Sequence, residues 1–371
     1  MSANRITHLR PFLRRTVLTF VPALCAITLV ACGGNDNDSD SEEDRANEPM
    51  PTATAPMQTV LNELAALGAK PLNTLTVEQA RKQATPADAV KSVLLKQGRS
   101  IAPEQVGSVE NRTFAGPGGP VAIRIYKPAG AGPFPLVLYI HGGGWVIADI
   151  DTYDASARAI TNAAGAIVVS THYRLAPEAK FPAAHDDTYA AYKWLLANAA
   201  SLGGMPRKLA VVGESAGGNM AASIAVRARD DGIATPVHQG LIYPLTNFAL
   251  DSPSQRQNRD AAPLNTAALQ WFGDKYLTSP ADGANPRFSV LRTPSLSGLA
   301  PATVITADID PLRSEGRAYA MKLSDAGVAV DYVNYSGVTH EFFGMTAVLE
   351  EARSAVARLG TNLKAAYART P

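Results

Sequence analysis

Hydrophobic positions from about residue 57 onwards recur with the spacing of secondary structure, and the first of them fall at helical intervals. Three stretches fit amphipathic helices, at residues 57–67, 76–83 and 87–97, and Gly68 closes the first. Apolar runs typical of β-strands follow at 107–114, 121–126 and 135–140. The Gly116-Pro117-Gly118-Gly119 turn between the first two runs predicts a hairpin.

Strands and helices then alternate along the rest of the chain. Near-continuous apolar runs predict strands at 166–170, 209–212, 237–243, 302–306 and 329–335. Helices are expected at 183–199 and after Ser215, Pro311 and Met345. Unbroken apolar strands that alternate with helices indicate an α/β fold, with a mostly parallel central sheet flanked by helices on both faces.

One segment, from residue 247 to about 291, interrupts this alternation. It is polar and rich in proline, and it holds one amphipathic stretch at 266–276. We interpret it as an insertion that packs with the N-terminal helices, residues 57 to about 100, as a helical cap. No internal repeat is evident, so residues 57–371 are predicted to form one domain that includes this cap.

The first 31 residues have the pattern of an export signal. Four arginines and no acidic residue precede an apolar run at 17–31, whose 15 residues are too few for a bilayer span of roughly 20. The run ends in Leu29-Val30-Ala31-Cys32, which resembles the cleavage site of a bacterial lipoprotein signal. Cys32 would then be the lipid-modified N-terminus. The alternative is an ordinary secretory signal cleaved near the same place.

Residues 32–56 predict a flexible tether. They are rich in Asn, Asp, Ser, Glu, Pro and Ala, a composition that buries too little apolar surface to fold. Gly33 stands where many lipoproteins retained at the inner membrane carry aspartate. We therefore expect an exported protein, lipid-anchored at the periplasmic side of the outer membrane or otherwise periplasmic or secreted. Its contact with the membrane is expected only through the lipid anchor.

Composition and charge argue against several function classes. After loss of the signal, 30 of the chain's 34 basic residues remain beside 33 acidic ones, a net charge of −3 that gives no reason to expect nucleic acid as a partner. Cys25 leaves with the signal, so Cys32 has no partner for an intrachain disulfide. The sequence has no C-x-x-C and no histidine pair at helical spacing, so neither a metal site nor a cofactor is predicted.

The candidate chemistry starts at the pentapeptide Gly213-Glu214-Ser215-Ala216-Gly217. It lies between the apolar run at 209–212 and an expected helix, which is the strand–turn–helix context that a G-x-S-x-G nucleophile needs. Such a turn exposes the serine hydroxyl above the sheet, where the free N–H groups of the helix also point. The motif alone is weak, because glycine and serine are common in turns, so its partners decide the interpretation.

The segment His141-Gly142-Gly143-Gly144-Trp145 offers an oxyanion hole. It directly follows the strand expected at 135–140, and its glycines leave backbone N–H groups accessible to a docked substrate. Together with the N–H of Ala216, these groups can bind a developing negative charge. The alternatives are a flexible loop or a phosphate-binding turn, but the following helix and the lysine of a phosphate loop are not evident.

Of the six histidines, His340 best suits a general base, because on this fold the chain order is serine, acid, histidine. His8 leaves with the signal, and His238 lies in an expected strand. Three others precede the serine: His141, His172 and His185. His340 alone follows the last expected strand.

The acid that orients the base is expected in the loop after the strand at 302–306. Asp308 and Asp310 both lie there. Asp310 precedes Pro311 and is equally suited to cap a helix. Spacing does not decide between the two aspartates.

Together these motifs resemble the hormone-sensitive-lipase-like branch of the α/β-hydrolases, the bacterial family IV esterases. Five segments carry the resemblance, which covers about residues 57–366: H-G-G-G-W at 141–145, D-T-Y-D at 151–154, Y-R-L-A-P-E at 173–178, G-E-S-A-G-G at 213–218 and D-P-L-R at 310–313. It implies an α/β-hydrolase fold with a cap, Asp310 as the acid, and Gly143 and Gly144 as oxyanion donors beside Ala216. Glu341 departs from the family, since many members have glycine after the histidine.

The activity that the resemblance implies is hydrolysis of carboxylic esters with short to medium acyl chains, through an acyl-serine intermediate, by a monomer or homodimer. Ser215 would be the nucleophile, His340 the base and Asp310 its orienting acid. Trp145 and Phe342 are candidates for the acyl pocket. Two alternatives stay open: an amidase or peptidase with the same triad, and a non-catalytic ligand-binding protein on the same fold. The second alternative would be expected to lose the serine, the histidine or the glycines, and all are present.

Overall fold

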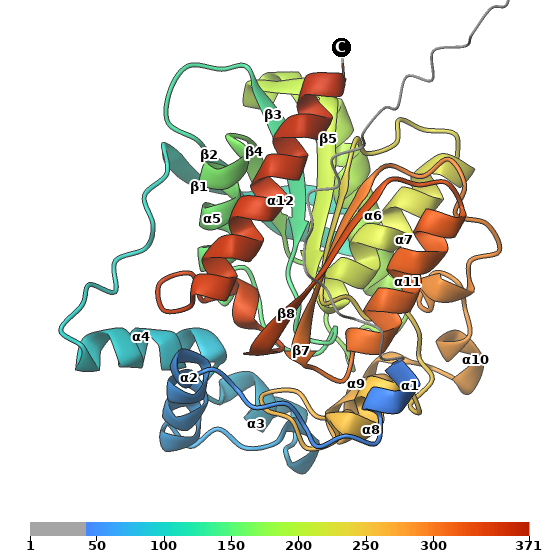
Figure 1. Cartoon of the computed structure of the whole chain (residues 1–371). Coiled ribbons are helices and arrows are strands. Elements are labelled where there is room, and N and C mark those ends of the chain that lie inside the picture. Colours follow the sequence, from blue (N-terminus) through green and yellow to red (C-terminus); the bar gives the residue numbers. More distant parts are fainter. Residues whose placement is uncertain (1–41, 371) are drawn as a thin grey trace, which may run out of the picture. The chain divides into compact units, whose positions relative to one another are not determined.

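An eight-stranded sheet runs through the computed structural model, which describes residues 42–370 of the chain (Figure 1). Its strands are β1 (Ser108–Gly116), β2 (Gly119–Lys127), β3 (Phe134–Ile140), β4 (Ile167–Thr171), β5 (Gly204–Glu214), β6 (Gln239–Ile242), β7 (Ala302–Ile309) and β8 (Val330–Thr339). They lie in the order β1-β2-β4-β3-β5-β6-β7-β8. The signal expected at 1–31 and the lipid site expected at Cys32 fall outside the described residues.

The sheet is parallel except at one edge. β1 and β2 form the expected hairpin, in which Gly116 is paired with Gly119, and β2 is antiparallel to β4. All pairings from β4 through β3, β5, β6 and β7 to β8 are parallel. The mostly parallel sheet that the sequence predicted is thus confirmed. β5 and β8 extend beyond the apolar runs that predicted them.

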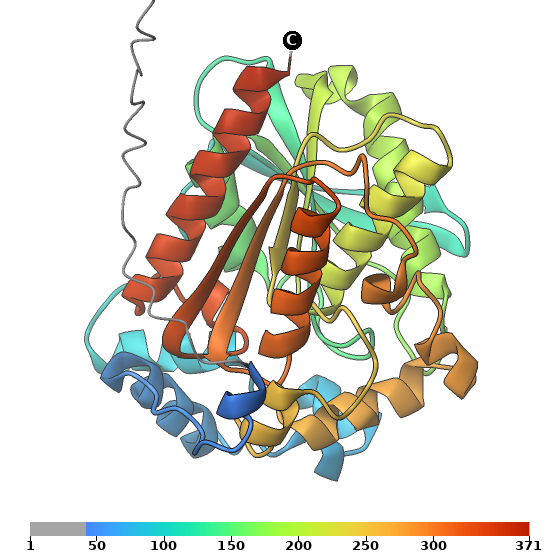
Figure 2. The same cartoon turned by 45° about the vertical axis from the view of Figure 1, so that its right-hand side comes forward.

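Helices cover both faces of the sheet. α5 (Asp154–Ala164) and α12 (Glu350–Arg369) pack on one face. The other face carries α6 (Ala183–Asn198), α7 (Ala216–Asp230) and α11 (Arg313–Asp325), as Figure 2 shows. In β3 the side chains of Val137 and Tyr139 join one buried cluster and those of Leu136, Leu138 and Ile140 the other. Both faces of the strand are therefore buried, which explains its unbroken apolar sequence.

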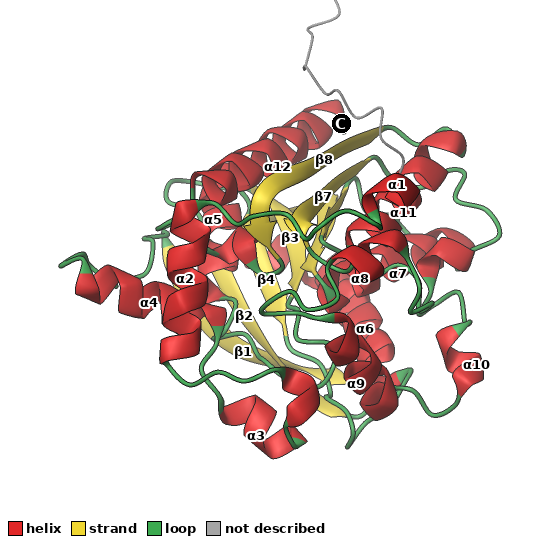
Figure 3. Ribbon diagram, turned by 60° about the horizontal axis from the view of Figure 1, so that its bottom comes forward, coloured by secondary structure: helices red, strands yellow, loops and turns green. Residues whose placement is uncertain are grey.

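A set of shorter helices lies beside the carboxyl ends of the strands (Figure 3). The N-terminal members are α2 (Ala55–Ala66), η1 (Leu72–Thr74), α3 (Val77–Lys82) and α4 (Pro86–Lys96). The members after β6 are α8 (Pro253–Gln257), α9 (Thr266–Tyr276), α10 (Pro280–Gly283) and η3 (Val290–Arg292). The two groups touch, since the indole N–H of Trp271 donates to the Leu75 carbonyl over 3.1 Å. No helix within residues 42–370 has the length and apolar character that a membrane crossing requires.

The expected tether differs from the structure in its described part. α1 (Glu42–Arg45) lies against α8, and the Thr54 N–H donates to the Gly337 carbonyl of β8 over 2.9 Å. Composition indicated that this segment has no fold of its own, but its polar groups bind to the domain instead of remaining free.

Candidate active site

Ser215 lies in a strained turn between β5 and α7. Its φ is +56° and its ψ is −119°, a conformation that a residue with a side chain rarely adopts. The Ser215 N–H donates to the Ile242 carbonyl over 2.9 Å, which holds the turn. A Cβ added at Gly217 would lie 2.0 Å from the Ile140 carbonyl oxygen, and one at Gly213 would lie 2.2 Å from the Gly217 oxygen. The glycines of the motif are therefore needed for close backbone packing.

His340 and Asp310 lie in line with the serine. His340 follows the last residue of β8, and its Nε2 is 2.9 Å from the Ser215 Oγ. Its Nδ1 is 2.7 Å from Asp310 Oδ2, on the loop after β7. Asp310 is fully buried, whereas Ser215 remains 8% exposed. The three side chains form a connected path from a buried carboxylate to a hydroxyl that a ligand can reach.

The Asp310 carboxylate is fixed from two sides. Its Oδ1 accepts the Leu312 N–H over 2.8 Å, while Oδ2 faces His340. α11 begins only at Arg313 without a side-chain cap, so Asp310 does not serve as the helix N-cap that its position before Pro311 allowed. Asp308 binds Arg313 and Asn334 instead of His340. The structure therefore brings Asp310 and not Asp308 to the histidine.

The pKa of His340 reflects two opposed effects. Burial, the largest single effect, lowers the pKa, but the carboxylates of Asp310, Glu341 and Glu214 together more than offset it, so the pKa lies above its usual value. The carboxylates therefore stabilise the imidazolium that forms when the ring takes the serine proton.

The glycine segment 142–144 is held with its N–H groups unused. Gly143 has a φ of +95° and Gly144 one of +55°, and within the described chain neither N–H has an acceptor. The carbonyls of His141 and Gly142 accept from the Tyr173 hydroxyl over 3.1 and 2.8 Å. The Gly143 carbonyl accepts the N–H groups of the two residues 146 and 147. This pattern leaves donors free near Ser215, as an oxyanion hole requires.

A cavity of about 490 Å³ opens over Ser215 and His340. It is lined mainly by apolar side chains of the short helices and by the glycine loop, among them Leu61, Leu64, Leu72, Ile147, Leu264 and Phe272. A Cβ on Gly144 would lie 2.3 Å from the Phe272 ring, so this ring covers the glycine loop directly. Most of these lining residues belong to no sequence motif, so the sequence did not identify them.

Trp145 and Phe342 do not line this cavity, so their prediction as pocket residues is wrong. Trp145 is 2% exposed and stacks on Tyr276 with ring centroids 4.8 Å apart and planes at 2°. Phe342 is fully buried against Tyr243 and Tyr335. Both rings turn away from the cavity into the core, where burial of a large apolar surface stabilises the loops that carry them.

Glu341 faces the cavity beside the histidine. Its φ is +72°, a left-handed conformation that favours glycine. Its Oε1 accepts from the Tyr153 hydroxyl over 2.7 Å and lies 3.8 Å from His340 Nε2. Tyr153 belongs to the D-T-Y-D segment, so this segment supports the site although its role was not foreseen.

Glu214, next to the serine, is a second buried carboxyl group. It accepts from the hydroxyls of Tyr139 and Tyr243, and the Tyr243 ring centroid is 4.5 Å from that of His340. Burial raises the pKa of Glu214 to about 7, and the nearby Glu341 adds to the rise.

No cluster of three or more metal-ligating side chains occurs among residues 42–370.

The other described histidines belong to the framework. His141 Nε2 is 3.0 Å from His172 Nδ1, and His172 also lines the edge of the cavity. His185 Nε2 is 2.9 Å from Asn219 Oδ1. His238 lies just before β6 rather than inside a strand, 2.8 Å from the Thr303 hydroxyl.

Comparison with known proteins finds the same fold among hydrolases. A family pattern described as "alpha/beta hydrolase fold" matches residues 137–344. An ethyl acetate hydrolase of Pseudomonas putida is 37% identical over 286 residues, which cover 76% of this chain and 88% of that protein. A carboxylic ester hydrolase of Mycobacterium tuberculosis is 42% identical over 243 residues, and the match covers 64% of this chain and 65% of that relative, just under two thirds of its length.

Solved structures of esterases resemble this chain over nearly all of their own length. The hyperthermophilic esterase from the archaeon Pyrobaculum calidifontis has a TM-score of 0.76 and 38% identity, and it covers 85% of this chain and 99% of its own. An ester hydrolase from the metagenome of Lake Arreo, solved with a bipyridine phosphonate derivative, has a TM-score of 0.76 and 38% identity, with coverage of 85% and 100%.

Proposed function

Because the chain belongs to the α/β-hydrolase family, in its hormone-sensitive-lipase-like branch, we propose that it is a serine carboxylesterase with Ser215 as its nucleophile. Its reaction is the hydrolysis of carboxylic esters. The observation that carries the assignment of the residues is the unbroken series of contacts from Asp310 through His340 to Ser215, at 2.7 and 2.9 Å.

The reaction follows from this geometry in two halves. Ser215 Oγ attacks the ester carbonyl carbon as His340 Nε2 takes the hydroxyl proton, and the carbonyl oxygen becomes an oxyanion bound by the N–H groups of Gly143, Gly144 and Ala216. When the oxyanion collapses, the bond to the alcohol oxygen breaks and His340 returns the proton to it. Water then attacks the acyl-serine with the same proton transfers, releasing the carboxylic acid and restoring Ser215.

The cavity favours short to medium acyl chains. Its volume of about 490 Å³ and its apolar lining fit a small aliphatic ester, whereas a long acyl chain would have to extend past Phe272 and the short helices. Amide or peptide hydrolysis uses the same triad and is the second candidate. A non-catalytic ligand-binding role is less well supported, because the triad and the free donors are assembled together.

Export and anchoring are part of the same proposal. The basic and apolar start of the chain and Cys32 support a lipoprotein at the periplasmic side of the outer membrane, or otherwise a periplasmic or secreted protein. In either case the mature protein would start near Cys32 and act as a monomer or homodimer.

The test is hydrolysis of p-nitrophenyl esters from acetate to dodecanoate, by the wild-type chain and by Ser215→Ala. Rapid turnover of acetate to hexanoate esters that the substitution abolishes is the expected result. A p-nitroanilide of the same acyl group distinguishes an amidase from an esterase. A folded protein that turns over none of these compounds would favour the ligand-binding alternative.

A further inference from the structure

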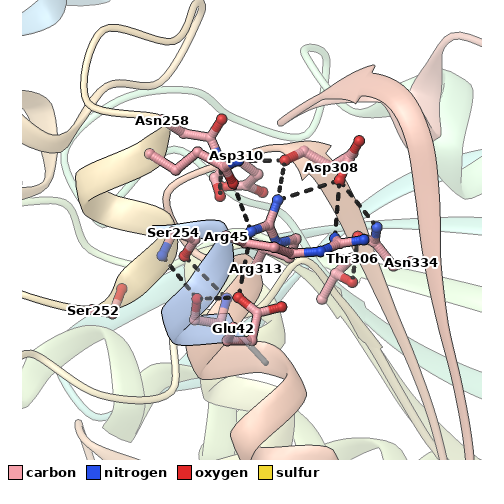
Figure 4. Close-up of polar contacts among 12 residues, drawn as sticks. Glu42, Arg45, Ser252, Ser254, Asn258, Thr306, Asp308, Asp310, Arg313 and Asn334 are labelled. Atoms are coloured by element: carbon pink, nitrogen blue, oxygen red, sulfur yellow. Dashed lines mark hydrogen bonds and ion pairs between the residues drawn. The ribbon is translucent and has the colours of Figure 1, made fainter. Parts of the chain in front are cut away.

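The segment that precedes the domain reaches the loop that carries Asp310. Figure 4 shows Glu42 and Arg45, both on α1, pointing toward Arg313 and Asp308. The contacts join residues that are more than 250 positions apart in the sequence, at both ends of the loop 308–314.

Arg313 is the first partner of this segment. Its side chain is only 1% exposed, so its charge needs carboxylates close by. Its Nη1 donates to the Asp308 carbonyl over 2.9 Å and lies 3.2 Å from the carboxylate. Its Nη2 donates to Gln257 Oε1 over 2.7 Å and lies 3.4 Å from Glu42 Oε2. Glu42 therefore supplies the second carboxylate for a buried guanidinium.

Glu42 is also joined to the backbone beside the catalytic acid. The Ser314 hydroxyl donates to Glu42 Oε2 over 2.5 Å and accepts the Ser254 N–H over 2.8 Å. The Ser254 hydroxyl in turn donates to the Pro311 carbonyl over 2.7 Å. This chain of hydrogen bonds ends one residue after Asp310.

The other end of the loop is held by Arg45. Its Nη1 lies 3.6 Å from Asp308 Oδ1, and Asn334 of β8 donates to the same oxygen over 3.3 Å. Asn258 donates to the carbonyls of both Asp308 and Asp310 over 3.2 Å. α1 thus contacts the loop on both sides of Asp310, through Arg45 before it and Glu42 after it. Residues of α8 and β8 hold the same loop.

We propose that Glu42 and Arg45 of α1 form a strap that holds the loop 308–314, and that Glu42 is a positioning residue for Asp310 in the proposed ester hydrolysis. The strap acts through Arg313 and Ser314 and touches no reacting atom. Glu42 follows Cys32, the expected lipid-attachment site, by only ten positions. The described residues that come first after the expected anchor therefore take part in organising the active site.

The experiment compares Glu42→Gln with Glu43→Gln in the full chain, purified in detergent. Both substitutions remove one carboxylate from α1, but Glu43 pairs with Arg256 at the surface and its side chain is 71% exposed. We expect Glu42→Gln to lower kcat for p-nitrophenyl acetate roughly threefold to tenfold with KM unchanged, because small displacements of catalytic groups are costly. The acid limb of the pH profile should move to lower pH, since a loosened Asp310 stabilises the His340 imidazolium less. Glu43→Gln should match the wild type.

Two further variants separate positioning from simple stabilisation. Glu42→Asp keeps the charge and should restore part of kcat, and Ser314→Ala should lower kcat in the same direction by a smaller factor. If Glu42→Gln lowers only the melting temperature and leaves kcat and the pH profile unchanged, or if Glu43→Gln lowers kcat equally, the strap has no positioning role. A wild-type chain without esterase activity would instead overturn the proposed function.

Discussion

At the scale of single residues, the identity of the catalytic acid depends on which carboxylate contacts His340. Motif spacing restricted the acid to Asp308 or Asp310, and the structure shows the reason for the choice: Asp308 is bound to Arg313 and Asn334, while Asp310 faces His340. Spacing alone could not decide this, although the family resemblance implied Asp310, because the direction of the Asp308 carboxylate depends on Arg313, whose partners come from distant parts of the chain. Trp145 and Phe342 failed as pocket predictions for a related reason, since an aromatic residue beside a catalytic motif can point to either side of its loop.

Asp310→Asn should lower kcat for p-nitrophenyl acetate by roughly 10³- to 10⁴-fold, because the amide favours the wrong histidine tautomer and gives the imidazolium no charge. Asp308→Asn is the matched change two positions away and should cost less than tenfold. Steady-state kinetics of both variants measure the difference. Equal losses in the two would mean that the loop as a whole, rather than Asp310, is required.

Glu341→Gln should move the acid limb of the kcat/KM profile to lower pH. The neutral form of His340 is the base, and the Glu341 carboxylate is one of the groups that raise the pKa of that ring. Removing the charge lowers this pKa, so the ring stays neutral, and the enzyme active, to a more acidic pH. Glutamine keeps the backbone conformation, and Glu350→Gln on the exposed start of α12 is the control. An unchanged or upward-shifted limb would contradict the assigned interaction.

At the scale of elements, the sequence predicted the strands that hold the site but not every helix that covers them. The helix at 266–276 was predicted at the observed bounds of α9, where an Asn265 side chain caps the first turn. α5 was not predicted, because its apolar face is built mostly from alanine and its interior contains several polar residues. The contacts of α1 are ion pairs with residues far along the chain, and local periodicity carries no information about such pairs.

Gly143→Ala should lower kcat by roughly 10²- to 10³-fold, the usual effect of losing one oxyanion donor. An added Cβ would lie 2.2 Å from the Ile147 carbonyl oxygen, so the loop must shift and its N–H with it. Gly298→Ala is the control, because Gly298 also has a positive φ, +74°, but open space around it. Circular dichroism should show a native fold for both variants. Near wild-type activity of Gly143→Ala would exclude this segment as the oxyanion hole.

At the scale of the whole molecule, the active site is shared between the sheet and the short helices. Loops at the carboxyl ends of β5, β7 and β8 supply the triad, and the N-terminal short helices and the segment after β6 supply most of the apolar lining of the cavity. The sequence predicted the first part through its motifs. It could not predict the second, because a cavity wall consists of ordinary apolar side chains whose meeting is decided by packing.

Phe272→Ala should widen the cavity above the glycine loop and favour longer acyl chains. The ratio of kcat/KM for p-nitrophenyl octanoate to that for p-nitrophenyl acetate is expected to rise roughly tenfold. Each methylene of the longer acyl chain that the widened cavity accommodates adds to the preference for octanoate over acetate. Leu277→Ala is the control, because Leu277 is buried at the end of the same segment but does not line the cavity. A ratio that changes equally in both variants would mean that the helix has moved and that no specific wall was removed.

The measurement that tests the central claim most directly is the site of covalent modification by a fluorophosphonate, which mimics the attacked ester and stays attached to the nucleophile. Digestion and mass spectrometry of the inactivated chain should place one phosphonyl group on Ser215, with labelling and loss of esterase activity in equal proportion. Ser215→Ala should take up no label and hydrolyse no ester. A label on another residue, or an unlabelled chain that remains active, would show that Ser215 is not the nucleophile.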